Sequence, residues 1–253
     1  MAPRVAKHPD VRRDEMMDAA LRLCVDVGYE AMSIEQVTQA VGVAKGTFYY
    51  HFGSKTDLLI AMVTRWADEL FDALESATSS LPGTGAHQFS TMMQLATAWK
   101  LDRLDDAMAS IPLLYRPENI ELRHRLFDAW GVRMYTLFLP LIQAGHDDGS
   151  FDVEDAPAAT QLILSLWLHG STSMFDRALA APDDDSYVEI LLRGIPALLT
   201  ASERLLGAAP GSFQPPDLHP ETLRAMRAPF LAALKGNWTV PALVEGGAYS
   251  AGS

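Results

Sequence analysis

The stretch SIEQVTQAVGVAKGTFYYHFGSKTDLL, residues 33–59, decides the fold of the N-terminal part of this chain. Ser33 precedes a short helical pattern that runs to Ala40, and its hydroxyl is a favourable N-cap. Gly42 then permits a turn conformation that a Cβ would penalise. Residues 44–50 form a second helical pattern. Two short helices around a glycine-containing turn predict a helix-turn-helix.

The side chains of this stretch divide into a buried and an exposed set. The apolar residues Ile34, Val37 and Val41 are expected in a small core, where Phe48 and Phe52 fix the second helix. The second helix of such a motif enters the major groove of DNA, so its remaining polar and aromatic side chains are candidates for DNA contacts. These are Lys45, Thr47, Tyr49, Tyr50 and His51.

Two further residues suit a nucleic-acid interface. Gly46 lets the helix backbone approach DNA closely. Lys55 begins the next helix, which Ser54 caps, so its ammonium and the backbone N–H groups can both meet a phosphate.

The segment AVGVAKGTFYYHFGSKTDLL, residues 40–59, resembles the signature of the TetR family of bacterial one-component regulators. The resemblance covers about residues 10–62. It implies a nine-helix, two-domain homodimer, in which three N-terminal helices bind a double-stranded DNA operator and a divergent C-terminal domain binds a small-molecule effector. A dimer demands a near-palindromic operator. The positions of this chain that match the family's usual DNA contacts are Ser33, Lys45, Thr47, Tyr49, Tyr50, His51 and Lys55.

Some of these residues keep an alternative interpretation. His51 can instead bond a neighbouring carbonyl, and Arg12 and Arg13 are either phosphate contacts or a solvated helix end. Ala44 departs from the family pattern, which often has Ser there, so a cap worth about 1 kcal/mol is expected to be missing.

Composition and charge set wider limits. With 253 residues and 49 % hydrophobic side chains, the chain can bury a substantial core, which excludes a disordered acidic protein. The net charge is −12, yet residues 1–55 are neutral and the whole excess of acid lies beyond them. The single Cys24 suits a reducing cytoplasm, and neither a signal peptide nor a membrane-spanning run is expected. We therefore expect a cytoplasmic protein with no membrane contact.

The hydrophobic periodicity is helical nearly everywhere, which predicts an all-α fold. We expect a helix-turn-helix DNA-binding domain at 1–53, a ligand-binding and dimerisation domain at 54–208, and a linker with a C-terminal extension at 209–253. In that extension, apolar residues from Leu223 to Leu234 favour one more helix, although Pro229 argues for a kink or a break.

The second domain carries more methionine and aromatic residues than a plain Leu/Ala core requires. Such side chains adapt well to flat apolar ligands, although ordinary core packing is the alternative for each. His169 is a candidate polar contact or a histidine with a purely structural role. The predicted ligand-binding set is Met92, Trp99, Phe127, Trp130, Met134, Trp167 and His169.

The helix at about 187–206 has a broad apolar face, and Gly170 on the preceding helix would allow a partner to approach closely. By resemblance, these two helices pair with their copies in the dimer.

Other chemistry is not expected. Cys24 shares a helix side with Ala20 and Val27, which favours a buried apolar role over redox sensing. The histidines are scattered, and the acidic residues near 147–155 do not have the spacing of a calcium loop. No catalytic residues, cofactor or metal are therefore predicted.

The sequence predicts a dimeric repressor released from its operator by a small apolar or aromatic ligand. An alternative is a DNA-binding regulator whose C-terminal domain binds a protein partner or only dimerises. An enzyme with a helical pocket is a distant third.

Overall fold

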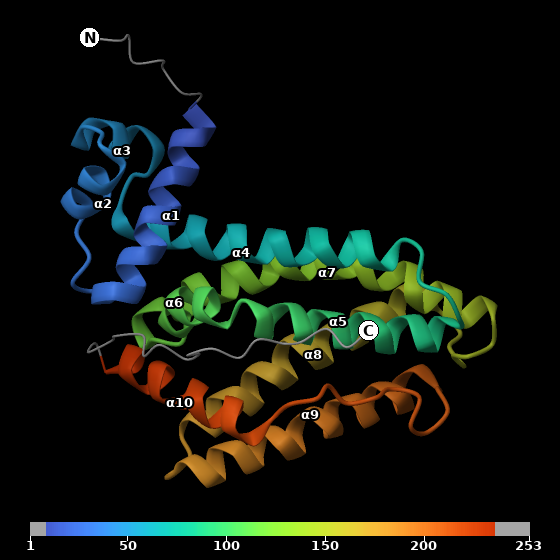
Figure 1. The fold of residues 1–253 in the computed structure, drawn as a ribbon. Helices are drawn as coiled ribbons and strands as arrows, with labels where there is room; N and C mark the ends of the chain where they lie inside the picture. The colour runs from blue at the N-terminus through green and yellow to red at the C-terminus, as the bar shows by residue number, and fades with distance from the viewer. Residues whose placement is uncertain (1–8, 236–253) are drawn as a thin grey trace, which may run out of the picture. The chain divides into compact units, whose positions relative to one another are not determined.

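The structure is a computed structural model that describes residues 9–235. Over this range it holds ten α-helices, one short 3-10 helix and no strand, which confirms the all-α prediction. The helices are α1 (Pro9–Val27), α2 (Ile34–Val41), α3 (Lys45–His51), α4 (Lys55–Thr78), α5 (Gly85–Asp102), α6 (Leu104–Leu114), the 3-10 helix η1 (Pro117–Asn119), α7 (Ile120–Asp147), α8 (Ala156–Leu179), α9 (Asp184–Leu206) and α10 (Pro220–Leu234) (Figure 1). No helix within residues 9–235 combines the length and the apolar character needed to cross a membrane.

Side-chain caps explain where several helices begin. Ser33 Oγ accepts from the Gln36 N–H at 3.1 Å, and Gln36 Oε1 accepts from the Ser33 N–H at 2.8 Å. This reciprocal pair satisfies two donors that the first turn of a helix leaves open. At the start of α4, α5, α8 and α9, a side-chain oxygen also accepts from a backbone N–H of the first turn; these caps are Ser54, Thr84, Asp155 and Asp183.

Packing divides the described residues into two compact units. Unit 1 comprises the described parts of 1–65, 104–116 and 229–253, and unit 2 comprises 66–103 and 117–228. Neither unit is one continuous segment. The three contiguous domains expected from the sequence remain a prediction.

In unit 1, α1, α2 and α3 enclose a small apolar core. Met16, Val37 and Phe48 are fully buried, and the ring of Phe52 lies 5.4 Å from that of Phe48. Helix α1 also packs against α6. The helix-turn-helix is therefore held from one side by apolar contacts, and the other side of α3 is left to solvent.

In unit 2, Arg133 of α7 ties this helix to α4. Its guanidinium donates to Asp68 at 3.0 Å, to Asp72 at 2.9 Å and to Glu75 at 2.9 Å. The ring of Phe89, which is fully buried, lies 5.3 Å from that of Phe138 in the unit's core.

Residues 209–228, which follow Ala208, are built into unit 2. Their first part has no helix, but Phe213 is 4 % exposed, and its ring lies 5.0 Å from that of Phe89. The Phe213 N–H donates to Glu203 Oε1 at 2.8 Å. The extra helix expected in the extension is present as α10, and Pro229 lies inside it. The resemblance implied nine helices, so α10 is an addition to that pattern.

Candidate nucleic-acid interface and ligand pocket

Gly42 forms the turn between α2 and α3. Its φ of 70° and ψ of 41° are left-handed, a conformation that favours glycine. The Val43 N–H then bonds the Thr38 carbonyl at 2.9 Å, which closes the end of α2. The turn glycine predicted from the sequence is confirmed.

Helix α3 presents two exposed tyrosines. Tyr49 is 51 % exposed and Tyr50 is 76 % exposed, although Tyr49 also meets the buried Phe48 edge-on at 5.5 Å. Ala44 at the N-cap makes no side-chain hydrogen bond, as expected from the sequence. An exposed aromatic pair on a fixed helix can contact base edges or the DNA backbone.

The other predicted DNA contacts on α3 lie on its accessible part. Lys45 forms an ion pair with Glu35 of α2, which lowers the pKa of the Glu35 carboxyl and raises that of Lys45. Gly46 faces open space, and Thr47 is half-buried. His51 is also half-buried, with its ring 4.9 Å from that of Tyr50. Their contacts with DNA remain predictions.

Two of the predicted contacts already have a role within unit 1. Ser33 caps α2 with its hydroxyl. Lys55 lies over the ring of Tyr29 at 4.3 Å and donates to the Glu30 carbonyl at 3.2 Å. Burial lowers the pKa of Lys55 and raises that of Tyr29 to about 12. A phosphate at Lys55 would therefore share this ammonium with Glu30.

The arginines of α1 have local partners. Arg12 Nη1 pairs with Glu15 at 2.8 Å, and the guanidinium of Arg13 lies 5.3 Å from the centre of the Phe52 ring. The sequence did not reveal the contact between Arg13 of α1 and Phe52, which follows α3, or the ion pair between Lys45 of α3 and Glu35 of α2, because both join different parts of the motif.

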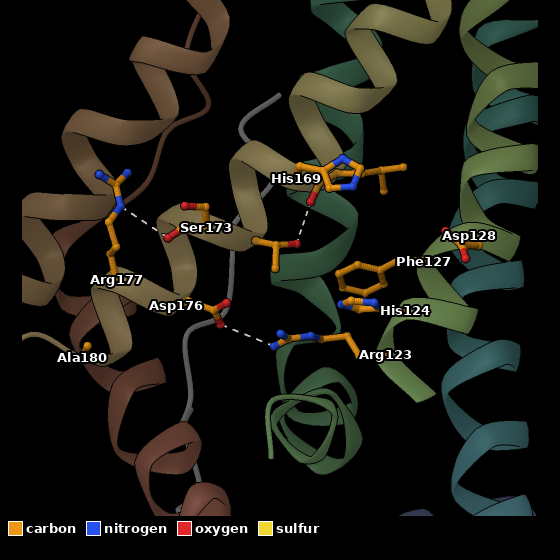
Figure 2. A pocket seen from close by; sticks show the side chains of 11 residues that line it. Arg123, His124, Phe127, Asp128, His169, Ser173, Asp176, Arg177 and Ala180 are labelled. Carbon is orange, nitrogen blue, oxygen red and sulfur yellow. Dashed lines mark hydrogen bonds and ion pairs between the residues drawn. The ribbon is translucent and has the colours of Figure 1, made fainter. Parts of the chain in front are cut away.

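Unit 2 contains a pocket of about 550 Å³ between α7 and α8 (Figure 2). Its walls combine apolar, cationic, acidic and hydroxyl side chains. The lining residues are Arg123, His124, Phe127, Asp128, Leu168, His169, Thr172, Ser173, Asp176, Arg177 and Ala180. Its volume falls within the range of small-molecule sites.

The polar contacts of the pocket run both across it and along α8. Arg123 Nη1 reaches across from α7 to Asp176 Oδ1 of α8 at 3.4 Å (Figure 2). His169 Nδ1 lies 3.2 Å from the Ser165 carbonyl, and Thr172 Oγ1 donates to the Leu168 carbonyl at 2.6 Å.

The pocket brings together two of the seven predicted ligand contacts, Phe127 and His169. The other five belong to the unit's core or pack against it: Met92, Trp99, Trp130, Met134 and Trp167. The Phe127 ring joins the two groups, because it lies 5.1 Å from that of Trp130. Among residues 9–235, the buried indole N–H of Trp130 has no hydrogen-bond partner, whereas that of Trp167 donates to Ser202 Oγ at 3.1 Å. Ligand binding by this set remains a prediction.

Sequence reasoning missed the polar lining of the pocket. Arg123 lies one helical turn from Phe127, and Asp176 lies two turns from His169. This helical spacing, which places the charged residues on the same face as a predicted ligand contact, was the signal in the sequence. It was not decisive, because charged residues on a helix face are ordinarily solvated. Within the described range, no cluster of three or more His, Cys, Asp or Glu residues is arranged to hold a metal ion.

Comparison with known proteins agrees with the helix-turn-helix geometry. Residues 16–62 match the family model of the bacterial regulatory proteins of the tetR family. The HTH-type transcriptional repressor KstR2 of Rhodococcus jostii (strain RHA1) is 25 % identical over 144 residues, which cover 55 % of this chain and 68 % of that protein. The repressor KstR of the same organism is 28 % identical over 190 residues, 71 % of this chain and 80 % of that protein.

The fold has solved counterparts. A TetR transcription regulator from Haloarcula marismortui is 16 % identical, with a TM-score of 0.55 over 78 % of this chain and 97 % of that one. This likeness concerns the fold, whereas the match over residues 16–62 concerns the sequence of the helix-turn-helix itself. Residues 16–62 therefore carry the DNA-binding domain of the TetR family of bacterial regulatory proteins, and the chain as a whole is similar to regulators of that family.

Proposed function

We propose that the protein is a dimeric transcriptional repressor that leaves its operator when a small molecule binds unit 2. The observation that carries this proposal is the presentation of α3, which is anchored by the buried Phe48 and exposes Tyr49 and Tyr50. The relatives KstR and KstR2 are named as repressors, which supports repression rather than activation. Such a protein acts in the cytoplasm, where bacterial DNA lies, and needs no catalytic residue.

The DNA contacts proposed for unit 1 are the eight residues predicted from the sequence. Lys45 offers the sharpest test, since Glu35 holds its ammonium at the surface of the motif. Lys45→Ala should weaken operator binding. The slope of the logarithm of the binding constant against the logarithm of the salt concentration should also fall by about one, the effect of losing one phosphate contact. Glu35→Gln, the matched change on the partner, should strengthen binding, because it releases the ammonium of Lys45.

Sequencing of genomic fragments retained by the purified protein provides the operator for these measurements. A near-palindromic enriched site supports the proposal. Equal binding by the wild type, Lys45→Ala and Glu35→Gln at several salt concentrations would remove Lys45 from the proposed DNA contacts.

The proposed dimer surface lies on α8 and α9. Leu162 is 57 % exposed and Leu192 is 38 % exposed, and isolated chains rarely leave a broad apolar face to solvent. Gly170 of α8 also packs closely on α9, because a Cβ there would lie 2.8 Å from Leu198 Cδ2 of the same chain. Its role in the approach of a partner stays a prediction.

Sedimentation equilibrium tests the dimer. Leu162→Glu and Leu192→Glu should each shift the protein towards monomer. The control is Val132→Glu on α7, where the wild-type side chain is 70 % exposed. An unchanged mass for both leucine variants would place the interface elsewhere.

Release by an effector requires a path from unit 2 to the DNA-binding helices. Helix α4 contributes residues to both units, so a ligand that displaces its second half acts on the first. A coupling free energy of about 1–3 kcal/mol would change operator occupancy about 5–150-fold.

The alternative function is a DNA-binding regulator whose unit 2 binds a protein or only dimerises. The pocket of about 550 Å³ supports a small-molecule effector over this alternative. The alternative would be favoured if ligands that bind in this pocket leave the operator occupancy unchanged.

A further inference from the structure

Glu30, in the turn between α1 and α2, contacts two cations of unit 1. Its carboxylate pairs with the guanidinium of Arg116, which follows α6, and its backbone carbonyl accepts from Lys55 Nζ at 3.2 Å. The Lys55 ammonium also lies 4.3 Å from the centre of the Tyr29 ring. The predicted phosphate contact at the start of α4 therefore meets the same turn as an ion pair.

The two charges of this ion pair act on Lys55 in opposite directions. Burial lowers the pKa of Lys55, whereas the Glu30 charge raises it and the Arg116 charge lowers it. A carboxylate this near is a second candidate partner for the ammonium, where it would compete with a DNA phosphate. In the structure the carboxylate is engaged by Arg116 instead.

Arg116 is a fixed part of unit 1. Its side chain is 7 % exposed, whereas that of Glu30 is 50 % exposed. The Arg116 N–H donates to the Leu113 carbonyl at 3.3 Å, and the Tyr115 N–H donates to a carbonyl of the same turn at 3.1 Å. Since arginine stays charged in proteins, a guanidinium held in this way is a permanent partner for the carboxylate.

Helix α10 supports the turn that carries Arg116. Phe230 of α10 is 2 % exposed, and its ring meets that of Tyr115 edge-on at 5.5 Å. Tyr115 directly precedes Arg116 in the chain. Helix α10 is the addition to the nine helices that the resemblance implied, and it contributes residues to both units. The C-terminal extension therefore reaches the turn at the end of α6.

We propose that Arg116 is a positioning residue for DNA binding: it holds the Glu30 carboxylate and so leaves the Lys55 ammonium to a backbone phosphate. Phe230 of α10 acts on the same ion pair through Tyr115. The proposal rests on the proposed function, because it concerns the phosphate contact of Lys55. It gives the C-terminal extension a part in the affinity for the operator.

A double-mutant cycle with a fluorescent operator fragment tests the proposal. Arg116→Met should weaken operator binding by up to about tenfold and lower the slope against the logarithm of the salt concentration by about one, as Lys55→Ala should. The loss should vanish in a Glu30→Gln background, because a neutral amide attracts the ammonium far less. Arg116→Lys should keep most of the affinity, since lysine can still pair with the carboxylate.

The same cycle tests Phe230. Phe230→Ala should weaken operator binding by less than Arg116→Met does, and Glu30→Gln should again remove the loss. The matched control is Arg125→Met in unit 2, where an arginine that is 77 % exposed loses its pair with Glu121. This control should bind the operator as the wild type does. Circular dichroism and the melting temperature show whether each variant is folded.

A second measurement needs no DNA. Acetic anhydride reacts with neutral amines, and a paired carboxylate raises the pKa of an amine, so pairing with Glu30 should slow the acetylation of Lys55. Lys45, which keeps its own pair with Glu35, is the internal reference. Mass spectrometry should show Lys55 reacting about threefold to tenfold more slowly in Arg116→Met than in the wild type, and Glu30→Gln should restore the rate.

The outcomes separate this proposal from the proposed function. Equal operator affinity of Arg116→Met and the wild type would overturn the proposal and leave the regulator intact. So would a loss that persists unchanged in the Glu30→Gln background, or an acetylation rate of Lys55 that stays constant. A wild-type protein that retains no genomic site, with Lys55 acetylation slowed as expected in Arg116→Met, would refute the proposed function and support the arrangement around Glu30.

Discussion

Arg227 of α10 donates from Nη1 to Asp184 Oδ1, in the first turn of α9, at 2.6 Å. Arg227 is 8 % exposed and also bonds the Ala181 carbonyl, and its guanidinium lies 5.9 Å from the centre of the Tyr187 ring. The middle of α10 is thus held against the first turn of α9. Residues 209–228 of the C-terminal extension are therefore part of the packed structure of unit 2.

Arg227→Met should lower the free energy of unfolding by about 1–3 kcal/mol, because the Ala181 carbonyl and Asp184 both lose a charged donor. Urea unfolding followed by circular dichroism measures the change. The control is Arg224→Met, in which a more exposed arginine loses Asp185; this loss should be below about 1 kcal/mol. Equal losses in the two variants would contradict a special role for the buried contact.

Gly46→Ala should separate stability from DNA binding. A Cβ at Gly46 would meet no atom within 4 Å, so alanine should stabilise α3 by up to about 1 kcal/mol. If the backbone at Gly46 approaches DNA closely, the added methyl group should weaken operator binding by about tenfold or more.

The control for this prediction is Ala44→Ser, which supplies the missing N-cap and should stabilise α3 by a similar amount. Thermal melting and fluorescence anisotropy with an operator fragment give the two readouts. Normal operator binding by Gly46→Ala would show that this glycine does not face the groove.

Gly85→Ala should lower the free energy of unfolding by about 3 kcal/mol or more. A Cβ at Gly85 would lie 2.1 Å from the backbone N of Gly145, where α5 meets α7, and backbone atoms cannot move aside cheaply. Gly131→Ala is the control, since its Cβ would meet Leu168 Cδ1 at an ordinary 3.4 Å. Chemical unfolding of both variants tests this, and a stable Gly85→Ala protein would show that α5 and α7 can separate without loss.

Cys24 should make the protein less stable at alkaline pH. Burial raises the pKa of the Cys24 thiol from 9.0 to about 12. Below pH 9 both the folded and the unfolded state keep the proton, whereas between pH 9 and 12 only the unfolded state loses it. The free energy of unfolding should therefore fall as pH rises through this window, by up to about 1.4 kcal/mol per pH unit from this group.

Tyr29, whose pKa is also raised to about 12, adds to this loss above pH 10. Urea unfolding between pH 8 and 10 should show a shallower decline in Cys24→Ala than in the wild type. Parallel curves for the two proteins would rule out the thiol as a source of the pH dependence.

The sequence predicted a feature correctly where the residues that form it lie close together in the chain. Ser33 and Gln36 are three residues apart, and Gly42 shapes its own turn, so both features are legible in the local sequence. Phe213 was harder to interpret, because the Gly-Ser-Pro composition around it indicates the end of regular helix but not the burial of its ring against Phe89.

The candidate ligand site shows the limit of periodicity. A helical stripe containing Trp130 and Met134 predicts burial, but it does not separate a side chain that fills the core from one that lines a cavity. Phe127 belongs to the same helix and lines the pocket, and only the placement of α8 distinguishes it.

The sequence by itself determined the all-α fold and the helix-turn-helix, because caps, turn glycines and helical periodicity act within a few residues. Tertiary structure alone decided the pocket and the attachment of α10. Arg123 and Asp176 are 53 positions apart in the chain, and Arg227 and Asp184 are 43 positions apart. Their meeting depends on the angles at which whole helices pack, and these angles follow from the combined shape of many side chains.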